Sequence, residues 1–292
     1  MEQKSDSLHT HYDLIVVGGG ASGMIAAGRA AERGLRVILL EKNKKLGAKL
    51  SISGGGRCNI LNAEEDEQVL LKKYGKSEQT LYSIFSQFGM KKTYDFFESL
   101  SLPLVVEHNK RAFPASHNAV DVVDTLEAYI RKNGVVVKTG TAVTNFVMNN
   151  GVIEKVVTGD EEFFAKEYIL ATGSVSHKET GSTGDGFIWL KNLGHTVHAP
   201  TPTIVPIAVS DQWIQVLAGV SLENIKITFF AEGIKAFNLS GTVLCTHFGL
   251  SGPLILNNAH KVADLLHSGT VTGTIDLFSD IDFPILEQKI MD

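Results

Sequence analysis

The sequence has few of the features that mark several common protein classes. Its 292 residues include only 2 cysteines, Cys58 and Cys245, and neither belongs to a C-x-x-C pair. This pattern argues against a disulfide scaffold, a dithiol redox centre or a zinc site, and we expect no bound metal. Acidic residues outnumber basic ones, 32 to 27, so the formal net charge at pH 7 is −5, and the chain has no long basic run. A nucleic-acid partner is therefore not expected.

Membrane-spanning and secretory features are missing as well. The uncharged stretch at residues 14–28 is shorter than the roughly 18 residues that read as a membrane span. The N-terminus, MEQKSDSLHTHYD, is polar and carries acidic residues, unlike a secretory signal. We therefore expect a cytoplasmic protein with no membrane partner. With 43% hydrophobic residues, the chain is long enough for one large domain or two ordinary ones.

What the chain does have is glycine, concentrated in two neighbouring loops: VVGGGASG at residues 16–23 and SISGGGRCNILN at 51–62. The apolar run DLIVV, at 13–17, predicts a buried parallel strand before the first loop. A stretch of small residues at 21–33 predicts a helix, and RVILLEK, at 36–42, predicts a second strand. Strand, glycine turn, helix and strand in this order predict a βαβ unit.

Further along, the hydrophobic period predicts helices first and strands afterwards. Helices are predicted around 81–88, 94–100 and 119–132. Strands are predicted over 135–148, 152–158 and 162–173. Two more helices are predicted, one that Asp185 caps and that ends at Gly194, and one that begins near Ser251. The segment HAPTPTIVP, at 198–206, is rich in proline and is the expected domain boundary. We therefore expect one domain over 1–200 and a second, strand-rich domain over 201–292.

Gly18, Gly20 and Gly23 match the G-x-G-x-x-G fingerprint of dinucleotide-binding folds. The spacing alone is weak evidence, but here it follows an apolar strand, opens a helix and precedes an acid, Glu41. The glycines would permit a tight turn, close approach of a pyrophosphate, and packing of the helix on the strand. Glu41 would accept hydrogen bonds from a ribose and repel a 2′-phosphate. The motif fits the ADP part that FAD and NAD share; a glycine turn without a ligand is the alternative.

The second loop, Gly54-Gly55-Gly56-Arg57, can form a backbone nest for anions with a fixed cation beside it. FAD extends beyond the reach of one βαβ turn, so its ribityl and flavin parts need a second strip of approachable backbone. Arg57 would pair with the pyrophosphate or lie near the flavin. A surface linker with an incidental arginine is the alternative for this loop taken alone. Two such loops together favour FAD.

Several motifs resemble one known family. LEKNKKLGAKLSISGGGRCNILN looks like the signature of the BaiN-like (YhiN-like) NAD(P)/FAD-dependent oxidoreductase flavoproteins. RAFPASHNAVDVVDTL, GSTGDGF and THFGLSGP resemble the later motifs of that family, so the resemblance covers essentially all of residues 12–280. It implies an α/β fold: a Rossmann-like FAD-binding domain of three-layer β-β-α architecture, with an inserted β-rich domain beginning near Thr201. It also implies non-covalent FAD, NAD(P)H as a possible electron donor and a small-molecule substrate of unknown identity.

The resemblance also implies where the cofactor lies. The glycine loop and Glu41 would hold the ADP half of FAD, the loop from Ser53 to Asn59 would follow the pyrophosphate and flavin, and the backbone at Val143 would contact adenine. Gly173 would mark a close passage of the chain past the cofactor. The predicted cofactor-binding residues are Gly18, Gly20, Ala21, Ser22, Gly23, Glu41, Lys42, Ser53, Gly54, Gly55, Gly56, Arg57, Cys58, Asn59, Val143, Thr172 and Gly173.

The sequence departs from the family pattern in two places. Ser174 and His177 stand where the family usually has a glycine pair and a proline. The chain stops at LEQKIMD, where the inserted domain of the family would still be in progress. We therefore expect a C-terminally truncated chain that lacks the glycine-rich segment closing over the flavin.

No catalytic residue is assigned from the sequence. His247, in THFGLSGP, and Arg57 are candidates, and a structural role is the alternative for His247. Cys58, beside Arg57, has either a lowered pKa or the role of a packed thiol.

We predict an FAD-dependent oxidoreductase that transfers hydride between flavin N5 and a reduced nicotinamide or an organic substrate. One alternative is a non-catalytic dinucleotide-binding fragment. Another is an NAD-binding dehydrogenase, which the second glycine loop disfavours. A third is a tRNA-modifying flavoprotein, which the acidic charge balance disfavours. The oligomeric state is left open.

Overall fold

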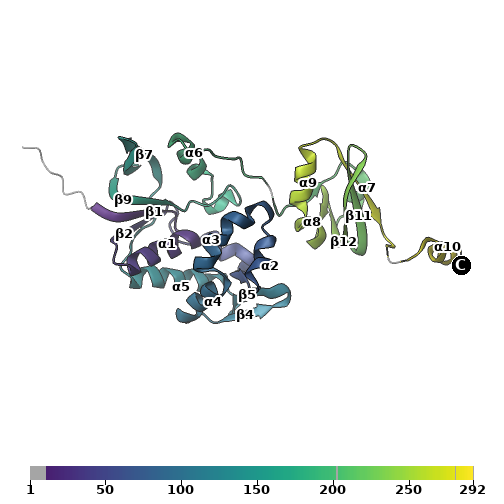
Figure 1. Ribbon diagram of the computed structural model, residues 1–292, viewed down its shortest axis with the longest axis horizontal. Coiled ribbons are helices and arrows are strands. Elements are labelled where there is room, and N and C mark those ends of the chain that lie inside the picture. The colour runs from purple at the N-terminus through teal and green to yellow at the C-terminus, as the bar shows by residue number, and fades with distance from the viewer. Residues whose placement is uncertain (1–10, 202, 280, 292) are drawn as a thin grey trace, which may run out of the picture. The chain divides into compact units, whose positions relative to one another are not determined.

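A computed structural model describes residues 11–201, 203–279 and 281–291, and the chain forms two compact units that divide between His198 and Ala199 (Figure 1). The helices and strands of the first unit are β1 His11–Val17, α1 Ala21–Glu32, β2 Val37–Leu40, η1 Leu50–Gly56, β3 Leu61–Asn62, α2 Glu67–Lys72, η2 Gly75–Ser77, α3 Glu78–Phe88, α4 Met90–Ser99, β4 Leu104–Glu107, η3 His108–Lys110, β5 Arg111–Pro114, α5 Ala119–Lys132, β6 Val136–Lys138, β7 Val143–Asn149, β8 Val152–Thr158, β9 Glu162–Leu170, η4 Lys178–Thr180 and α6 Asp185–Asn192. Within the described residues, no helix is both long and apolar enough to cross a membrane.

One sheet with the strand order β6-β2-β1-β9-β8-β7 organises the first unit. Its first four strands run parallel, and β8 and β7 continue it as an antiparallel meander. β1, α1 and β2 form the predicted βαβ unit. Asn150 and Gly151 form the hairpin turn between β7 and β8, with φ angles of 51° and 83°, as an Asn-Gly sequence favours. The α/β Rossmann-like fold is confirmed.

The sheet lies between two different cores because successive side chains of a strand point to opposite faces. Leu14 and Val16 of β1 pack into a core shared with helices α1 and α5. Ile15 and Val17 point the other way, into a core completed by β7, β8 and Trp189 of α6. Figure 1 shows α1 and α5 on one side of β1, and β7 and α6 on the other. This arrangement is the predicted three-layer β-β-α architecture.

The segment between β2 and α5 adds a small antiparallel sheet, β3-β5-β4, and three helices, α2 to α4. Helices α3, α4 and α5 correspond to the three helices predicted here. Phe96 of α4 packs edge-on against Tyr129 of α5, with ring centroids 5.2 Å apart. This contact ties the added segment to the helical layer of the Rossmann sheet.

The second unit is strand-rich and has a core of its own. Its elements are β10 Ile207–Ala208, α7 Gln212–Val216, β11 Ser221–Ala231, β12 Ile234–Thr246, β13 Gly249–Ser251, α8 Pro253–Leu256, α9 Ala259–Leu266, β14 Val271–Asp276 and α10 Phe283–Met291. The sheet order is β10-β13-β12-β11-β14, and all pairs are antiparallel. Ile227 and Val243 of the sheet pack with Ile255 of α8 and Val262 of α9. Helix α8 begins at Pro253, close to the predicted start.

Candidate functional site

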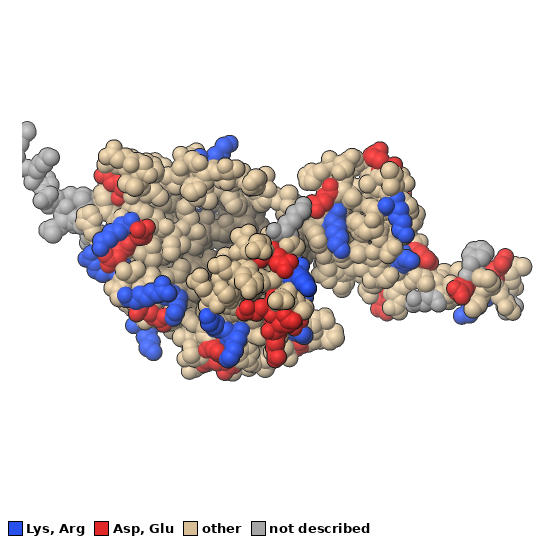
Figure 2. Space-filling model, viewed as in Figure 1, with Lys and Arg blue, Asp and Glu red and all other residues tan. Residues whose placement is uncertain are grey.

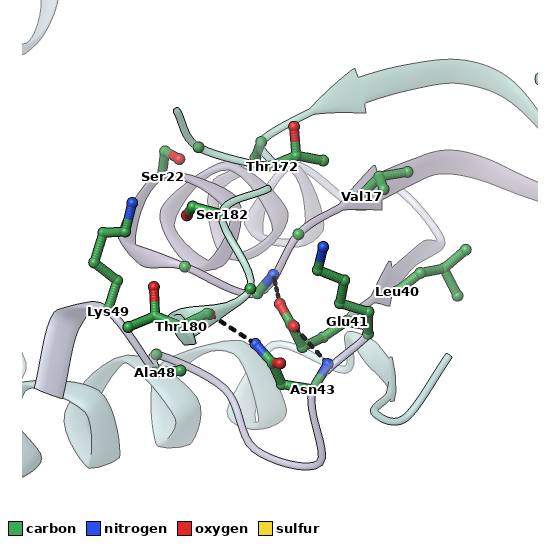
Figure 3. A pocket seen from close by; sticks show the side chains of 18 of the residues that line it. Val17, Ser22, Leu40, Glu41, Asn43, Ala48, Lys49, Thr172, Thr180 and Ser182 are labelled. Carbon is green, nitrogen blue, oxygen red and sulfur yellow. Dashed lines mark hydrogen bonds between the residues drawn. The ribbon is translucent and has the colours of Figure 1, made fainter. Parts of the chain in front are cut away.

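A cavity of about 450 Å³ lies at the carboxyl ends of β1 and β2, in the first unit (Figure 3). Open α/β sheets bind their ligands at this edge. Of the predicted cofactor-binding residues, the cavity brings together Gly18, Gly20, Ala21, Ser22, Glu41, Lys42, Ser53, Val143, Thr172 and Gly173. Outside its lining lie Gly23, Gly54, Gly55, Gly56, Arg57, Cys58 and Asn59.

The glycine loop after β1 is shaped by close contacts on one side and open space on the other. Gly18 has a φ of +109°, and a Cβ atom there would overlap the carbonyl oxygen of Ala171. A Cβ on Gly23 would overlap the carbonyl oxygen of Gly18, so this helix needs glycine to approach the loop. A Cβ on Gly20 would meet nothing within 4 Å. The loop therefore leaves room for a ligand at Gly20 itself.

Helix α1 begins at this loop, with Gly20 as its N-cap. No side chain caps the helix, so its first N–H groups depend on other partners. Ala21 and Ser22, in its first turn, line the cavity. An uncapped helix N-terminus carries partial positive charge and free donors, which suit a phosphate group. The donor set and the bare backbone fit the pyrophosphate of a dinucleotide.

Glu41, at the end of β2, ties the loops around the cavity together. Its carboxylate accepts hydrogen bonds from the backbone N–H of Gly19, at 2.6 Å, and of Asn43, at 2.7 Å. The residue is buried, with 8% of its surface exposed. Glu41 therefore holds the glycine loop in place, in addition to the ribose contact that the sequence predicts.

Lys42 joins the end of β2 to the start of α6. Its ammonium group donates to Thr183 Oγ1 at 2.6 Å and to Asp185 Oδ2 at 2.8 Å. The bond from Lys42 and a second one from the Thr183 hydroxyl lower the pKa of the Asp185 carboxyl. The predicted capping role of Asp185 is wrong, because Gly184 is the N-cap of α6 and Asp185 is its first helical residue.

Two more side chains from the loop after β2 reach the segment 173–185, which we call the crossing segment. Asn43 Nδ2 donates to the carbonyl of Thr180 at 3.0 Å, and Lys49 Nζ donates to the carbonyl of Ser176 at 2.6 Å. Asn43, Lys49 and Thr180 line the cavity (Figure 3). None of these three was predicted from the sequence. The only signal available was the run of polar residues directly after a buried strand.

The second glycine loop has the backbone conformation expected of a glycine run, but its arginine contacts other side chains of the protein. Gly54, Gly55 and Gly56 have φ angles of 58°, 67° and 82°. Arg57 donates from Nη1 to Glu107 at 2.8 Å, and its guanidinium carbon lies 4.2 Å from the ring centroid of Phe113. The role of Arg57 at a pyrophosphate or flavin stays a prediction.

Cys58 is buried in the core between the sheet and its helices. Burial raises the pKa of its thiol, although a hydrogen bond with Ser53 acts in the opposite direction. The alternative with a lowered pKa is therefore wrong, and Cys58 is a packed thiol.

His247 belongs to the second unit, in the turn between β12 and β13. It is exposed, and its ring packs edge-on against Phe248, with centroids 4.9 Å apart. A catalytic role for His247 stays a prediction.

The chain matches the family model described as HI0933-like protein Rossmann domain over residues 12–270. It belongs to the HI0933-like family. The family recognised from the SGGGRCN loop is thereby confirmed. The match covers both the Rossmann-like unit and most of the strand-rich unit of this HI0933-like protein.

Two curated relatives and one solved structure show what this HI0933-like protein is similar to. It is 28% identical over 257 residues to the 3-dehydro-bile acid delta(4,6)-reductase of Clostridium scindens, covering 87% of this chain and 61% of that protein. It is 27% identical over 276 residues to the ribosomal RNA dihydrouridine synthase of Escherichia coli K12, covering 93% and 65%. A flavocytochrome c3 fumarate reductase shares the fold, with 19% identity, a TM-score of 0.53 and coverage of 73% and 47%. The chain therefore spans less than two thirds of the length of these relatives.

Proposed function

We propose that the chain binds FAD in the cavity at the carboxyl ends of β1 and β2 and acts as an oxidoreductase on a small organic substrate. The observation that carries this proposal is the uncapped start of α1 beside Gly20, where open space meets free backbone donors. FAD, when bound, supplies hydride transfer, so the chain itself needs only to bind and orient the reactants.

The residues of the cavity have distinct roles in holding the ADP half. The first turn of α1, at Ala21 and Ser22, binds the pyrophosphate through its N–H groups. Glu41, at the end of β2, faces the ribose hydroxyls. Leu40 and Val143 supply an apolar wall for the adenine, next to Trp189.

The names of the two relatives point to one reaction class. A delta(4,6)-reductase reduces carbon–carbon double bonds of a steroid, and the prefix 3-dehydro places a ketone beside them. Dihydrouridine differs from uridine by reduction of a ring double bond that is conjugated to a carbonyl. Addition of hydride to the carbon distant from the carbonyl, and of a proton to the neighbouring carbon, would reduce a double bond of either kind. We infer that this chain reduces a double bond conjugated to a carbonyl, with NAD(P)H as the source of the hydride.

A uridine in ribosomal RNA is the second candidate substrate, and it is favoured by the likeness to the Escherichia coli relative. The charge distribution favours a small molecule instead. The net charge is −5, and Figure 2 shows lysine and arginine interspersed with aspartate and glutamate on the visible face of the chain. RNA-binding surfaces usually gather basic side chains on one face. Dihydrouridine content of ribosomal RNA incubated with the chain and NAD(P)H distinguishes the two candidates.

The test of the proposed function is oxidation of NADH or NADPH by the FAD-loaded chain in the presence of a conjugated ketosteroid or a uridine-containing RNA. We expect oxidation that depends on the acceptor and yields the saturated product. A chain that holds FAD but turns over none of these acceptors would support the alternative of a non-catalytic dinucleotide-binding chain.

A further inference from the structure

Of the two cationic side chains that line the cavity, one forms an ion pair and the other, among the described residues, forms none. Lys42 and Lys49 are the two cationic side chains in its lining. Lys42 forms an ion pair with Asp185 at 2.8 Å. Lys49 donates to the carbonyl oxygen of Ser176 at 2.6 Å and lies 3.3 Å from the hydroxyl of the same residue. Among the described residues, no carboxylate oxygen lies within 4.0 Å of Lys49 Nζ.

Lys49 lies at the end of the cavity where the first turn of α1 is proposed to bind the pyrophosphate. Figure 3 shows its side chain extending toward Ser22, in the first turn of α1. A Cβ atom built on Gly173 would lie 4.0 Å from Lys49 Nζ, so the ammonium group is also near the backbone that leaves β9. The uncapped N-terminus of α1 and this ammonium group therefore face the same part of the cavity.

The partner of Lys49 is one that a phosphate can replace. Ser176 offers a neutral carbonyl and a neutral hydroxyl, whereas a phosphate oxygen offers a charge-assisted hydrogen bond, which is roughly twice as strong. The nearby Glu179 does not take that place: its pKa is lowered first by its own backbone N–H and by His177, and least by Lys49.

We propose that Lys49 is the pyrophosphate-binding cation of this site, and that it exchanges the Ser176 carbonyl for a phosphate oxygen when a dinucleotide binds. This inference rests on the proposed function, because it requires that the cavity take the ADP part of FAD. Lys49 stands 26 positions after Gly23, and the G-x-G-x-x-G fingerprint does not include it.

The test compares the binding of ADP and adenosine to the full chain by titration calorimetry. These probes share the base and ribose, and only ADP carries the diphosphate. In the Lys49→Met variant we expect ADP to bind about 10- to 100-fold more weakly, the range for loss of a hydrogen bond to a charged group. Adenosine should bind as it does to the unaltered chain. Lys45→Met is the matched control, because Lys45 is exposed in the same loop and lies outside the cavity lining.

Each result has a clear meaning. Equal losses for ADP and adenosine would overturn the inference, since Lys49 would then act only by holding the crossing segment. An unchanged affinity for ADP would also overturn it. Lys49→Arg keeps the charge and should retain most of the ADP affinity, which separates a charge effect from a folding defect. If the unaltered chain bound neither ADP nor FAD, the proposed function itself would fail; if it bound both and Lys49→Met bound ADP with the same affinity, only this inference would fail.

Discussion

Substitution of Glu41 by glutamine tests whether this carboxylate holds the glycine loop as well as the ribose. Both carboxylate oxygens accept hydrogen bonds from backbone N–H groups, those of Gly19 and Asn43. In Glu41→Gln one oxygen becomes an NH₂ group that faces another donor. One buried N–H then loses its acceptor, and the remaining bond loses its charge.

A hydrogen bond to a charged group contributes about 1.5–3 kcal/mol to stability. The neutral amide is easier to bury than the carboxylate, which offsets part of the loss. We therefore expect Glu41→Gln to lower the free energy of unfolding of the first unit by about 2 kcal/mol in the absence of any cofactor.

Urea unfolding followed by tryptophan fluorescence measures this loss. The chain has 2 tryptophans, and replacing the exposed Trp213 with phenylalanine leaves Trp189 to report on the first unit alone. Glu154→Gln, an identical change at an exposed position of β8, is the control. If Glu41→Gln unfolded at the same urea concentration as this control, the account of Glu41 as a structural tie would be refuted.

Three further substitutions have distinct expected results. Gly20→Val should keep the stability of the chain but abolish ADP binding, because its side chain would occupy open space in the cavity; calorimetry and thermal unfolding measure the two effects. Gly28→Ala should lower the free energy of unfolding by about 1–3 kcal/mol, since the new Cβ would overlap the ring of Tyr129. The pKa of Asp13 is lowered from 3.8 to about 2, chiefly by its hydrogen bond with Lys166, so the stability that this carboxylate adds is complete above its ordinary pKa. That part is lost as the pH falls from 3.8 to about 2, and Asp13→Asn should lack it in acid unfolding curves.

Local patterns in the sequence were sufficient to predict the βαβ unit, the β7–β8 hairpin and helix α5. These elements are specified by residues close in sequence: an apolar run, a glycine turn or a stripe of apolar side chains at helical spacing. The same patterns placed Gly20 and Glu41 at the carboxyl edge of the sheet, where both line the cavity.

The cross-links over the cavity were beyond such patterns. Lys49 and Ser176 are 127 positions apart, and Asn43 and Thr180 are 137 apart. The hydrophobic periods of strands and helices, 2 and 3.6 residues, cannot predict which distant residues meet. These contacts depend instead on how β9 returns beside β1. The burial of Cys58, which raises the pKa of its thiol, likewise could not be predicted, because the neighbouring Arg57 suggested an exposed, charged surrounding.

The most direct test of the central claim is the visible absorption spectrum of the purified chain after incubation with FAD and removal of the free cofactor. The account predicts flavin absorption that stays with the protein, releases FAD on heating, and is missing from Gly20→Val prepared in the same way. A folded chain that retained no flavin, or a Gly20→Val variant that retained as much as the unaltered chain, would contradict the assignment of the cavity at the carboxyl ends of β1 and β2.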